Sequence, residues 1–205
     1  MTQERVAPMK ESKEGLDLLA GLVFRGKGRQ VYSIDGRSGS GKTQLSRALA
    51  ARLREGGLAV EILEVERFVP GWDGLARGTE RVAHDILEPF LRGESARVSP
   101  WNWYLSCYDA PVAVPEDPRC EVLLLEGCGA ASAACAPLCT ATIWMECEDS
   151  LRRERVRERE GDPSSWWDMW AAQEAALLSK RDAPALADAV ARWDAGQLHV
   201  EMRGF

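Results

Sequence analysis

The stretch Gly36-Arg37-Ser38-Gly39-Ser40-Gly41-Lys42-Thr43 decides the fold of this chain, because it satisfies the pattern G-x-x-x-x-G-K-[ST] at every constrained position. The run before it, residues 31–35, is short, β-branched and aromatic, and it predicts a buried strand. After it, Leu45, Leu49 and Leu53 recur every four residues, as one face of a helix requires. A strand, a glycine-rich loop and a helix form the context in which this pattern binds phosphate rather than merely turning the chain.

The residue types of the loop indicate its chemistry. Its glycines let the backbone curl so that successive N–H groups point at a phosphate, at the positive end of the helix dipole. Lys42 would reach the β- and γ-phosphate oxygens, and the Thr43 hydroxyl would bind Mg²⁺. We therefore expect ATP with Mg²⁺, although the pattern does not separate ATP from GTP. The phosphates would lie on Gly36, Ser38, Gly39, Ser40, Gly41, Lys42 and Thr43.

Length and charge limit the class of protein. The chain of 205 residues is expected to form a single domain over residues 1–205, with residues 1–9 disordered. A net charge of −6 argues against a nucleic-acid partner, because no basic field would gather phosphates. The apolar runs are too short for a membrane span, and the first residues hold no apolar signal segment, so we expect a cytoplasmic protein. Homo-oligomers are left open.

The sequence contains six cysteines, which we expect to be reduced in such a protein. Cys128, Cys135, Cys139 and Cys147 lie near one another in the sequence, but they form no C-x-x-C pair and match no zinc spacing. Buried thiols are therefore predicted in preference to a metal site.

Strands alternate with helices along the rest of the chain. Apolar and β-branched runs predict strands at 58–65, 122–127, 140–145 and 198–202. Helical periodicity predicts helices at 11–24, 75–91, 149–160, 163–180 and 185–193. This alternation predicts an α/β fold of three layers, α/β/α, with a mostly parallel sheet and a helical lid within 149–180. No linker is long enough to divide the chain.

Two glutamates are expected at strand ends. Glu126 closes an apolar strand beside the glycine loop, where a carboxylate can hold Mg²⁺ through water, unless it is an ordinary strand-end acid. Glu66 also follows a strand, and open α/β sheets bind ligands beyond the carboxyl ends of their strands. Glu66 could therefore accept the proton of an attacking hydroxyl. The alternatives are that Glu66 is a solvated acid and that Asp73, in the adjoining aromatic loop, is the base or a substrate contact.

The run of residues 151–159 is rich in arginine. Arg152, Arg155 and Arg159 lie at i, i+3 and i+7, so they share one helix face. Guanidinium groups on one face suit a polyphosphate whose charge rises in the transition state. We expect Arg155 and Arg159 to act on the phosphates from the lid. The alternative is a solvated helix held by Glu/Arg pairs.

Aromatic residues are concentrated in predicted loops. Trp72, Trp101 and Trp103 would offer flat apolar faces in a cleft, which suits a ring-bearing substrate. Asn102 has a neutral amide that donates and accepts hydrogen bonds, so we expect a neutral ring-containing acceptor. The tryptophans of the helix predicted at 163–180 have the spacing of core residues.

Taken together, residues 34–43, the strand end Glu126-Gly127 and the arginine-rich helix resemble the uridine kinase family of P-loop kinases. The resemblance is closer to the uridine kinase-like proteins of actinobacteria and spans roughly residues 30–180. It includes Pro-Gly-Trp-Asp-Gly-Leu at 70–75, Trp101-Asn102-Trp103, Glu126-Gly127-Cys128-Gly129, and Arg155 with Arg159.

The resemblance implies transfer of the γ-phosphate of ATP to a hydroxyl of a small, nucleoside-like acceptor. Uridine kinases have an aspartate at the position of Glu66, a second acid at Arg67, and a Tyr-Asp pair at Trp101-Asn102. The resemblance therefore supports phosphate transfer to an alcohol more than it supports uridine. A nucleotide-dependent switch, a regulatory ATPase and a catalytically silent binding protein remain alternatives. A GTPase is disfavoured because residues 179–182 (Ser-Lys-Arg-Asp) follow a helical pattern rather than a strand.

Overall fold

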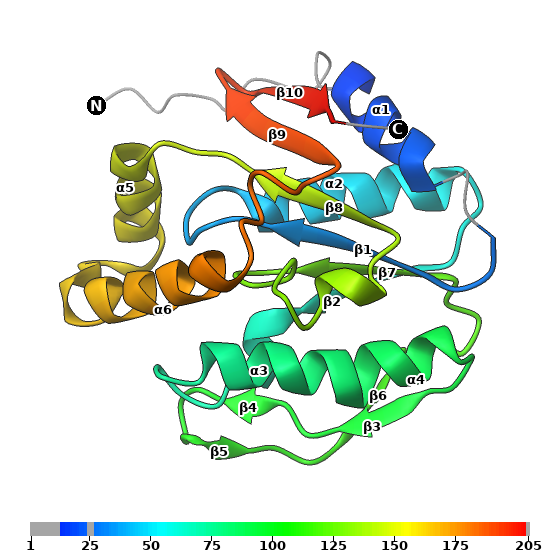
Figure 1. Cartoon of the computed structure of the whole chain (residues 1–205), viewed down its shortest axis with the longest axis horizontal. Helices are drawn as coiled ribbons and strands as arrows, with labels where there is room; N and C mark the ends of the chain where they lie inside the picture. Colours follow the sequence, from blue (N-terminus) through cyan, green and yellow to red (C-terminus); the bar gives the residue numbers. More distant parts are fainter. Residues whose placement is uncertain (1–12, 24–26, 204–205) are drawn as a thin grey trace.

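The computed structural model describes residues 13–23 and 27–203, so the disorder expected for residues 1–9 lies outside the described residues. Its central sheet has six strands: β1 (Gln30–Asp35), β2 (Val60–Glu64), β7 (Val122–Glu126), β8 (Ala141–Met145), β9 (Ala189–Asp194) and β10 (Gln197–Met202). Their order across the sheet is β10-β9-β8-β1-β7-β2 (Figure 1). Neighbouring strands are parallel except β9 and β10. The predicted mostly parallel sheet is confirmed.

Helices and two small antiparallel strand pairs surround this sheet. The α-helices of the described part are α1 (Lys13–Val23), α2 (Lys42–Glu55), α3 (Leu75–Val82), α4 (Glu88–Leu91), α5 (Asp149–Glu160) and α6 (Trp167–Lys180). The short helical turns are η1 (Val65–Phe68), η2 (Ala83–Leu87), η3 (Ala136–Leu138) and η4 (Pro163–Ser165). The antiparallel pairs are β3 (Ala96–Val98) with β6 (Val112–Val114), and β4 (Trp101–Asn102) with β5 (Cys107–Tyr108).

The sheet is covered on both faces, which gives the predicted three layers. Every residue of β1, β7 and β8 is buried, as parallel strands between two helical layers require. On β1, Tyr32 and Ile34 belong to the apolar cluster beneath α1 and α2, whereas Val31 belongs to the cluster beneath α3, η2 and α4. Adjacent residues of one strand thus face opposite layers. Figure 1 shows α2 on one side of the sheet and α3 with α4 on the other.

The helices α5 and α6 lie at one end of the sheet. In Figure 1 they are at the left, where the arrowheads of β1 and β8 point. This is the carboxyl end of the parallel strands, the edge at which open α/β sheets bind ligands. No helix in the described ranges is long and apolar enough to cross a membrane. The six cysteines are free thiols.

The helix predicted at 185–193 is wrong. Residues 183–186 form a turn, and the chain then enters β9. The alanines in this run favour a helix when they are considered alone, but Ala187, Ala189 and Ala191 are buried with the two-residue period of a strand. Ala189 and Ala191 pair with Ile143 and Met145 of β8. Pairing with the open edge of β8 therefore overrides the local helix preference.

Two other boundaries move in ways that affect the site. The strand predicted at 58–65 ends at Glu64, so Glu66 lies in the 3-10 turn η1 and not at the strand tip. The helix predicted at 163–180 is divided at Trp166, between η4 and α6. The helix predicted at 75–91 is confirmed, with a π turn in its middle.

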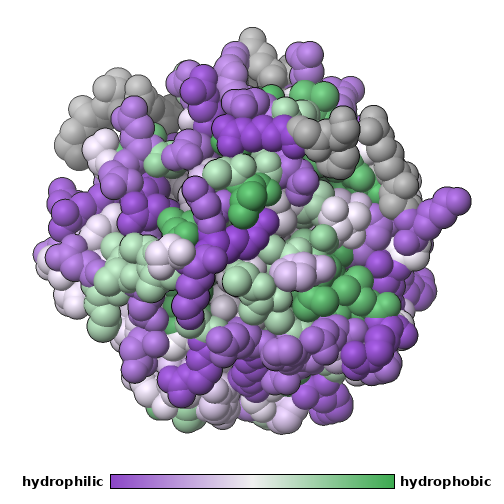
Figure 2. Space-filling model, viewed as in Figure 1, coloured by the Kyte–Doolittle hydropathy of each residue, from purple (hydrophilic) through white to green (hydrophobic). Residues whose placement is uncertain are grey.

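The face of the molecule seen in Figure 2 is polar around most of its edge. Figure 2 shows mainly hydrophilic residues at the periphery of this face, with hydrophobic residues reaching the surface in patches nearer its centre. Among the large hydrophobic side chains, Tyr104 and Leu105 at the turn between β4 and β5 are 94% and 62% exposed.

Candidate functional site

The glycine loop between β1 and α2 has a backbone that only glycine accommodates at two positions. Gly39 has φ +80°, and a Cβ built there would lie 2.4 Å from the carbonyl oxygen of Arg152. Gly36 has φ +157°, and its Cβ would lie 2.6 Å from the carbonyl oxygen of Met145. The glycines therefore allow positive φ and let α5 and β8 approach the loop closely.

Lys42 and Thr43 begin α2 and face the acid of β7. The Thr43 hydroxyl donates to Glu126 Oε1 at 3.0 Å. The Lys42 Nζ donates to the carbonyl oxygen of Arg37 at 3.1 Å. Burial opposes the charge of Lys42, but nearby carboxylates, those of Glu66 and Glu126 among them, hold the pKa of Lys42 above its ordinary value. Lys42 is therefore a buried cation at the bottom of the loop.

The donor set of Thr43 and Glu126 fits Mg²⁺. A hydroxyl and a carboxylate are the oxygen ligands that this hard cation prefers. Glu126 is only 5% exposed. Burial raises the pKa of its carboxyl, while Lys42 and the hydrogen bond from Thr43 oppose that shift. A divalent cation would favour the charged carboxylate further.

A cleft of about 320 Å³ opens above the loop, and we call it the phosphate cleft. It joins four side chains that the sequence analysis placed on the phosphates or the acceptor: Lys42, Glu66, Arg155 and Arg159. Thr43, Glu64 and Glu126 also line it. Arg155 Nη1 donates to the carbonyl oxygen of Ser40 at 3.4 Å, whereas Arg159 pairs with Glu160.

Arg152 does not face the phosphate cleft with the other two arginines. It is 2% exposed, and its Nη1 donates to the carbonyl oxygen of Ser38 at 2.8 Å. Its Nη2 donates to Asp149 Oδ1 at 2.6 Å, and its guanidinium lies 5.4 Å from the centre of the Trp167 ring. Three guanidiniums were expected on one face toward the phosphates, but only those of Arg155 and Arg159 line the phosphate cleft. Arg152, in the first turn of α5, clamps the backbone of the loop instead.

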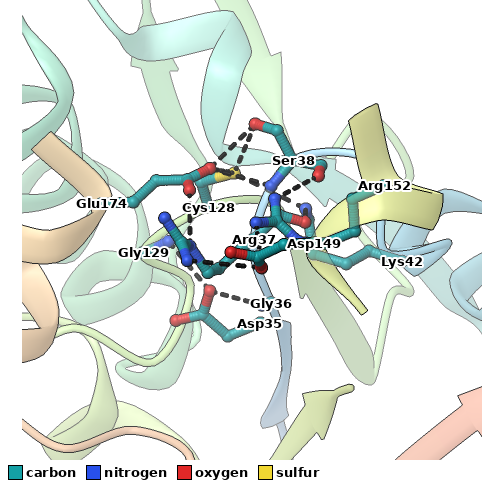
Figure 3. A network of polar contacts seen from close by, with 10 residues as sticks. All are labelled: Asp35, Gly36, Arg37, Ser38, Lys42, Cys128, Gly129, Asp149, Arg152 and Glu174. Atoms are coloured by element: carbon teal, nitrogen blue, oxygen red, sulfur yellow. Dashed lines mark hydrogen bonds and ion pairs between the residues drawn. The ribbon is translucent and has the colours of Figure 1, made fainter. Parts of the chain in front are cut away.

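A buried carboxylate of α6 holds the loop from its other side (Figure 3). Glu174 Oε1 accepts from the Ser38 N–H and from the Ser38 hydroxyl, both at 2.8 Å. Its Oε2 accepts from Arg37 Nε at 3.1 Å. Burial raises the pKa of the Cys128 thiol to about 12, so the thiol stays protonated and donates to Glu174 Oε1 at 3.2 Å. Burial alone would raise the pKa of Glu174, but these hydrogen bonds and the charge of Lys42 lower it.

Asp35 ties the loop to the segment after β7. Its Oδ1 accepts from the N–H groups of Gly36 and Gly129 at 2.7 and 2.9 Å, and its Oδ2 accepts from the N–H of Ala131 at 2.8 Å. Our interpretation of the sequence did not single out Asp35 or Glu174. The burial of Glu174 could have been predicted from helical spacing, because it falls four residues after Trp170 and three before Leu177, on the buried face of α6.

Glu66 lies where two cavities meet. Its side chain reaches solvent through the phosphate cleft, and desolvation by the surrounding residues raises the pKa of its carboxyl against the charges of Lys42 and Arg159. The Trp103 Nε1–H donates to the carbonyl oxygen of Glu66 at 3.1 Å, which fixes η1 against the loop after β4. Asp73 is exposed, and among the described residues it lines neither cavity. Geometry thus favours Glu66 over Asp73 as a base.

The second cavity, of about 260 Å³, is lined by four tryptophans, and we call it the tryptophan cavity. Trp72 packs against the other three, with its ring centre 5.0 Å from that of Trp103, 5.2 Å from that of Trp166 and 6.0 Å from that of Trp170. Trp72 and Trp103 were expected beside an acceptor. Of the three tryptophans predicted to be core residues, Trp166 and Trp170 pack against the core and also line this cavity. Trp167 belongs to no core cluster, and its ring lies under the guanidiniums of Arg152 and Arg153 instead.

Trp101 and Asn102 do not line the tryptophan cavity. The prediction that Trp72, Trp101 and Trp103 face one cleft is therefore corrected, because Trp101 lies outside it. The Trp101 ring packs edge-on against Tyr108, 5.1 Å away, within the β4–β5 hairpin. The Asn102 side-chain oxygen accepts from the N–H groups of Tyr104 and Leu105, at 3.1 and 2.9 Å. Asn102 is thus used to form the turn, a role for which its short amide is suited.

Similarity to known proteins is found at the level of the fold. No family model matches the sequence, and no curated protein matches it. A structure described as a possible uridine kinase from Bacillus stearothermophilus aligns with a TM-score of 0.65 at 18% identity, over 87% of this chain and 97% of that chain. A putative fructose transport system kinase from Silicibacter sp. TM1040 aligns with a TM-score of 0.53 at 22% identity, over 89% and 97%. The YGR205w protein aligns with a TM-score of 0.56 at 10% identity, over 99% and 100%.

At these identities the likeness concerns the fold. The phosphate-binding loop joins β1 to α2, the sheet is mostly parallel, and helices cover both of its faces. The chain therefore has the P-loop α/β fold of these three structures, the first of which is described as a possible uridine kinase.

Proposed function

We propose that this protein is an ATP-dependent phosphotransferase that moves the γ-phosphate to a hydroxyl of a small, ring-containing acceptor. One observation carries the proposal: Ser38, Glu66 and Arg159 line both the phosphate cleft and the tryptophan cavity. A molecule in the tryptophan cavity would then lie next to the γ-phosphate, with a carboxylate between the two. Two of the similar structures are described as kinases, which supports the same reaction class.

Each charged group has a role in this reaction. The N–H groups of the loop and Lys42 bind the β- and γ-phosphates of ATP. Mg²⁺, held by Thr43 and through Glu126, would neutralise phosphate charge. Arg155 and Arg159 would stabilise the charge that develops on the transferred group and exclude water when α5 closes.

Glu66 would act as the general base. As the acceptor oxygen attacks the γ-phosphorus, its proton passes to the Glu66 carboxylate, and the bond from the γ-phosphorus to the bridging oxygen of ADP breaks. The raised pKa of Glu66 brings the carboxylate closer to the basicity that proton transfer needs. We expect the protein to act in the cytoplasm, a location that its free thiols fit.

The test is ADP release in the presence of nucleosides and other ring-containing alcohols, against a reaction without acceptor. The phosphorylated product is identified by mass spectrometry. Acceptor-dependent ADP release with a matching product supports the proposal. ADP release that no acceptor changes would instead support the regulatory ATPase, for which a tryptophan cavity beside the γ-phosphate has no evident use.

A further inference from the structure

The charges that face the tryptophan cavity do not balance. Two carboxylates, Glu66 and Glu160, line it together with one guanidinium, that of Arg159. Arg159 Nε donates to Glu160 Oε1 at 2.9 Å, so the one cation is held by one of the two acids. Glu66 and Glu160 are near enough for the charge of Glu160 to oppose ionisation of Glu66 and raise its pKa. Lys42, from the phosphate cleft, and Arg159 oppose this shift, but among the residues that line the cavity itself the two carboxylates outnumber the one guanidinium.

Closure of the lid would increase this excess. Arg159 also lines the phosphate cleft, and in the proposed reaction its guanidinium moves to the phosphates. Its side chain is 62% exposed, so little packing holds it where it is. Glu160 would then lose its partner while it still borders the indole rings. A cation supplied by the acceptor would restore the pairing.

The tryptophans supply the other half of a cation site. Indole faces attract cations more strongly than the faces of other aromatic side chains, and aromatic cages are the usual recognition site for quaternary ammonium groups. Trp72 has three other indoles within 6.0 Å, all of which line the cavity. Within the described residues, the cation–π contacts of tryptophan are those of Arg152 and Arg153 with Trp167, outside the cavity.

We propose that the phosphate acceptor is a cationic alcohol, whose ammonium group lies among the tryptophans and pairs with Glu160 while its hydroxyl reaches Glu66. This inference rests on the proposed function and names its substrate class. It replaces the expectation of a neutral acceptor, because that expectation depended on Asn102, which serves the β4–β5 turn instead.

The experiment uses two alcohols of equal shape that differ in charge: 4-(trimethylammonio)benzyl alcohol and 4-tert-butylbenzyl alcohol. Binding of each is measured by calorimetry with ADP and Mg²⁺ present, and phosphate transfer is measured with ATP. We expect the cation to bind at least tenfold more tightly, about 1.4 kcal/mol. Equal binding, tighter binding of the neutral alcohol, or no binding of either overturns the proposal.

Variants locate the preference within the cavity. Trp166→Leu and Glu160→Gln should each reduce the ratio of the two affinities, whereas Trp101→Leu, on the β4–β5 hairpin, should leave the ratio unchanged. Glu160 is 40% exposed, so Glu160→Gln tests the charge without disturbing the core. If neither cavity variant changes the ratio, the cation binds elsewhere and the proposal is wrong.

The two proposals can fail separately. Preferential binding of the cation without phosphate transfer to any alcohol would remove the proposed function and keep a cation site. Transfer to neutral alcohols alone would keep the kinase and remove the cationic acceptor.

Discussion

Glu174→Gln should loosen the phosphate-binding loop although Glu174 lines neither the phosphate cleft nor the tryptophan cavity. The carboxylate is 4% exposed and accepts from the Ser38 N–H, the Ser38 hydroxyl, the Cys128 thiol and Arg37 Nε. Glutamine keeps one acceptor oxygen, but it removes the charge and turns an NH₂ group toward Arg37 or Ser38. The donors of Ser38 and the donor of Arg37 cannot then both find an acceptor oxygen on this side chain.

The size of the effect follows from these contacts. A hydrogen bond to a charged group contributes about 1.5–3 kcal/mol, against about 0.5–1.5 kcal/mol for a neutral one. Weakening the two bonds from Ser38 and losing the one from Arg37 should lower the free energy of unfolding by about 3 kcal/mol. For a chain of this length that corresponds to a fall in melting temperature of roughly 6–12 °C. Looser placement of Ser38 should also weaken ATP binding.

Calorimetric unfolding at neutral pH measures the loss, with Glu158→Gln, an exposed site on α5, as the control for charge removal. The pH dependence gives a second check. Because the pKa of Glu174 is lowered in the folded protein, its stabilising contribution is present above the pKa of the unfolded chain. That contribution is lost as pH falls through the folded pKa, so the gap between wild type and variant should narrow in acid. The role assigned to Glu174 would be refuted if the variant had the melting temperature of the control. It would also be refuted if the difference in stability between wild type and variant did not become smaller in acid.

Three further outcomes are expected of the proposed kinase. Lys42→Ala should retain the fold and lose phosphate transfer, measured as ADP release; turnover at the wild-type rate would contradict its role at the γ-phosphate. Glu66→Gln should lower kcat by about 10²–10⁴-fold with little change in ATP affinity. In the wild-type pH–rate profile, the rate should begin to fall in acid at a pH above the ordinary glutamate pKa. Arg159→Ala should slow transfer more than Arg157→Ala, an exposed residue of the same helix; equal rates for the two would exclude a lid role for Arg159.

The sequence determined the parts of this protein that depend on short-range pattern. The phosphate-binding loop could be predicted because glycines, a lysine and a threonine at fixed spacing have one backbone solution between a strand and a helix. The covered sheet could be predicted because a parallel strand that is buried on both faces is apolar throughout, as residues 122–125 are. Glu126 could be placed beside Thr43 because the carboxyl ends of neighbouring parallel strands meet at one edge of the sheet.

Only the tertiary structure decided which side chains meet across long separations. Ser38 and Glu174 are 136 residues apart, so no local pattern indicates their hydrogen bond. The segment entering β9 has the composition of a helix, and its strand exists because β8 offers an unpaired edge. Arg152 and Arg155 have equivalent positions in the sequence pattern, but the approach of α5 to Gly39 buries the first and leaves the second at the phosphate cleft. Trp101 lies in β4 and Trp103 in the turn that follows it, so one ring packs against Tyr108 while the other lines the tryptophan cavity.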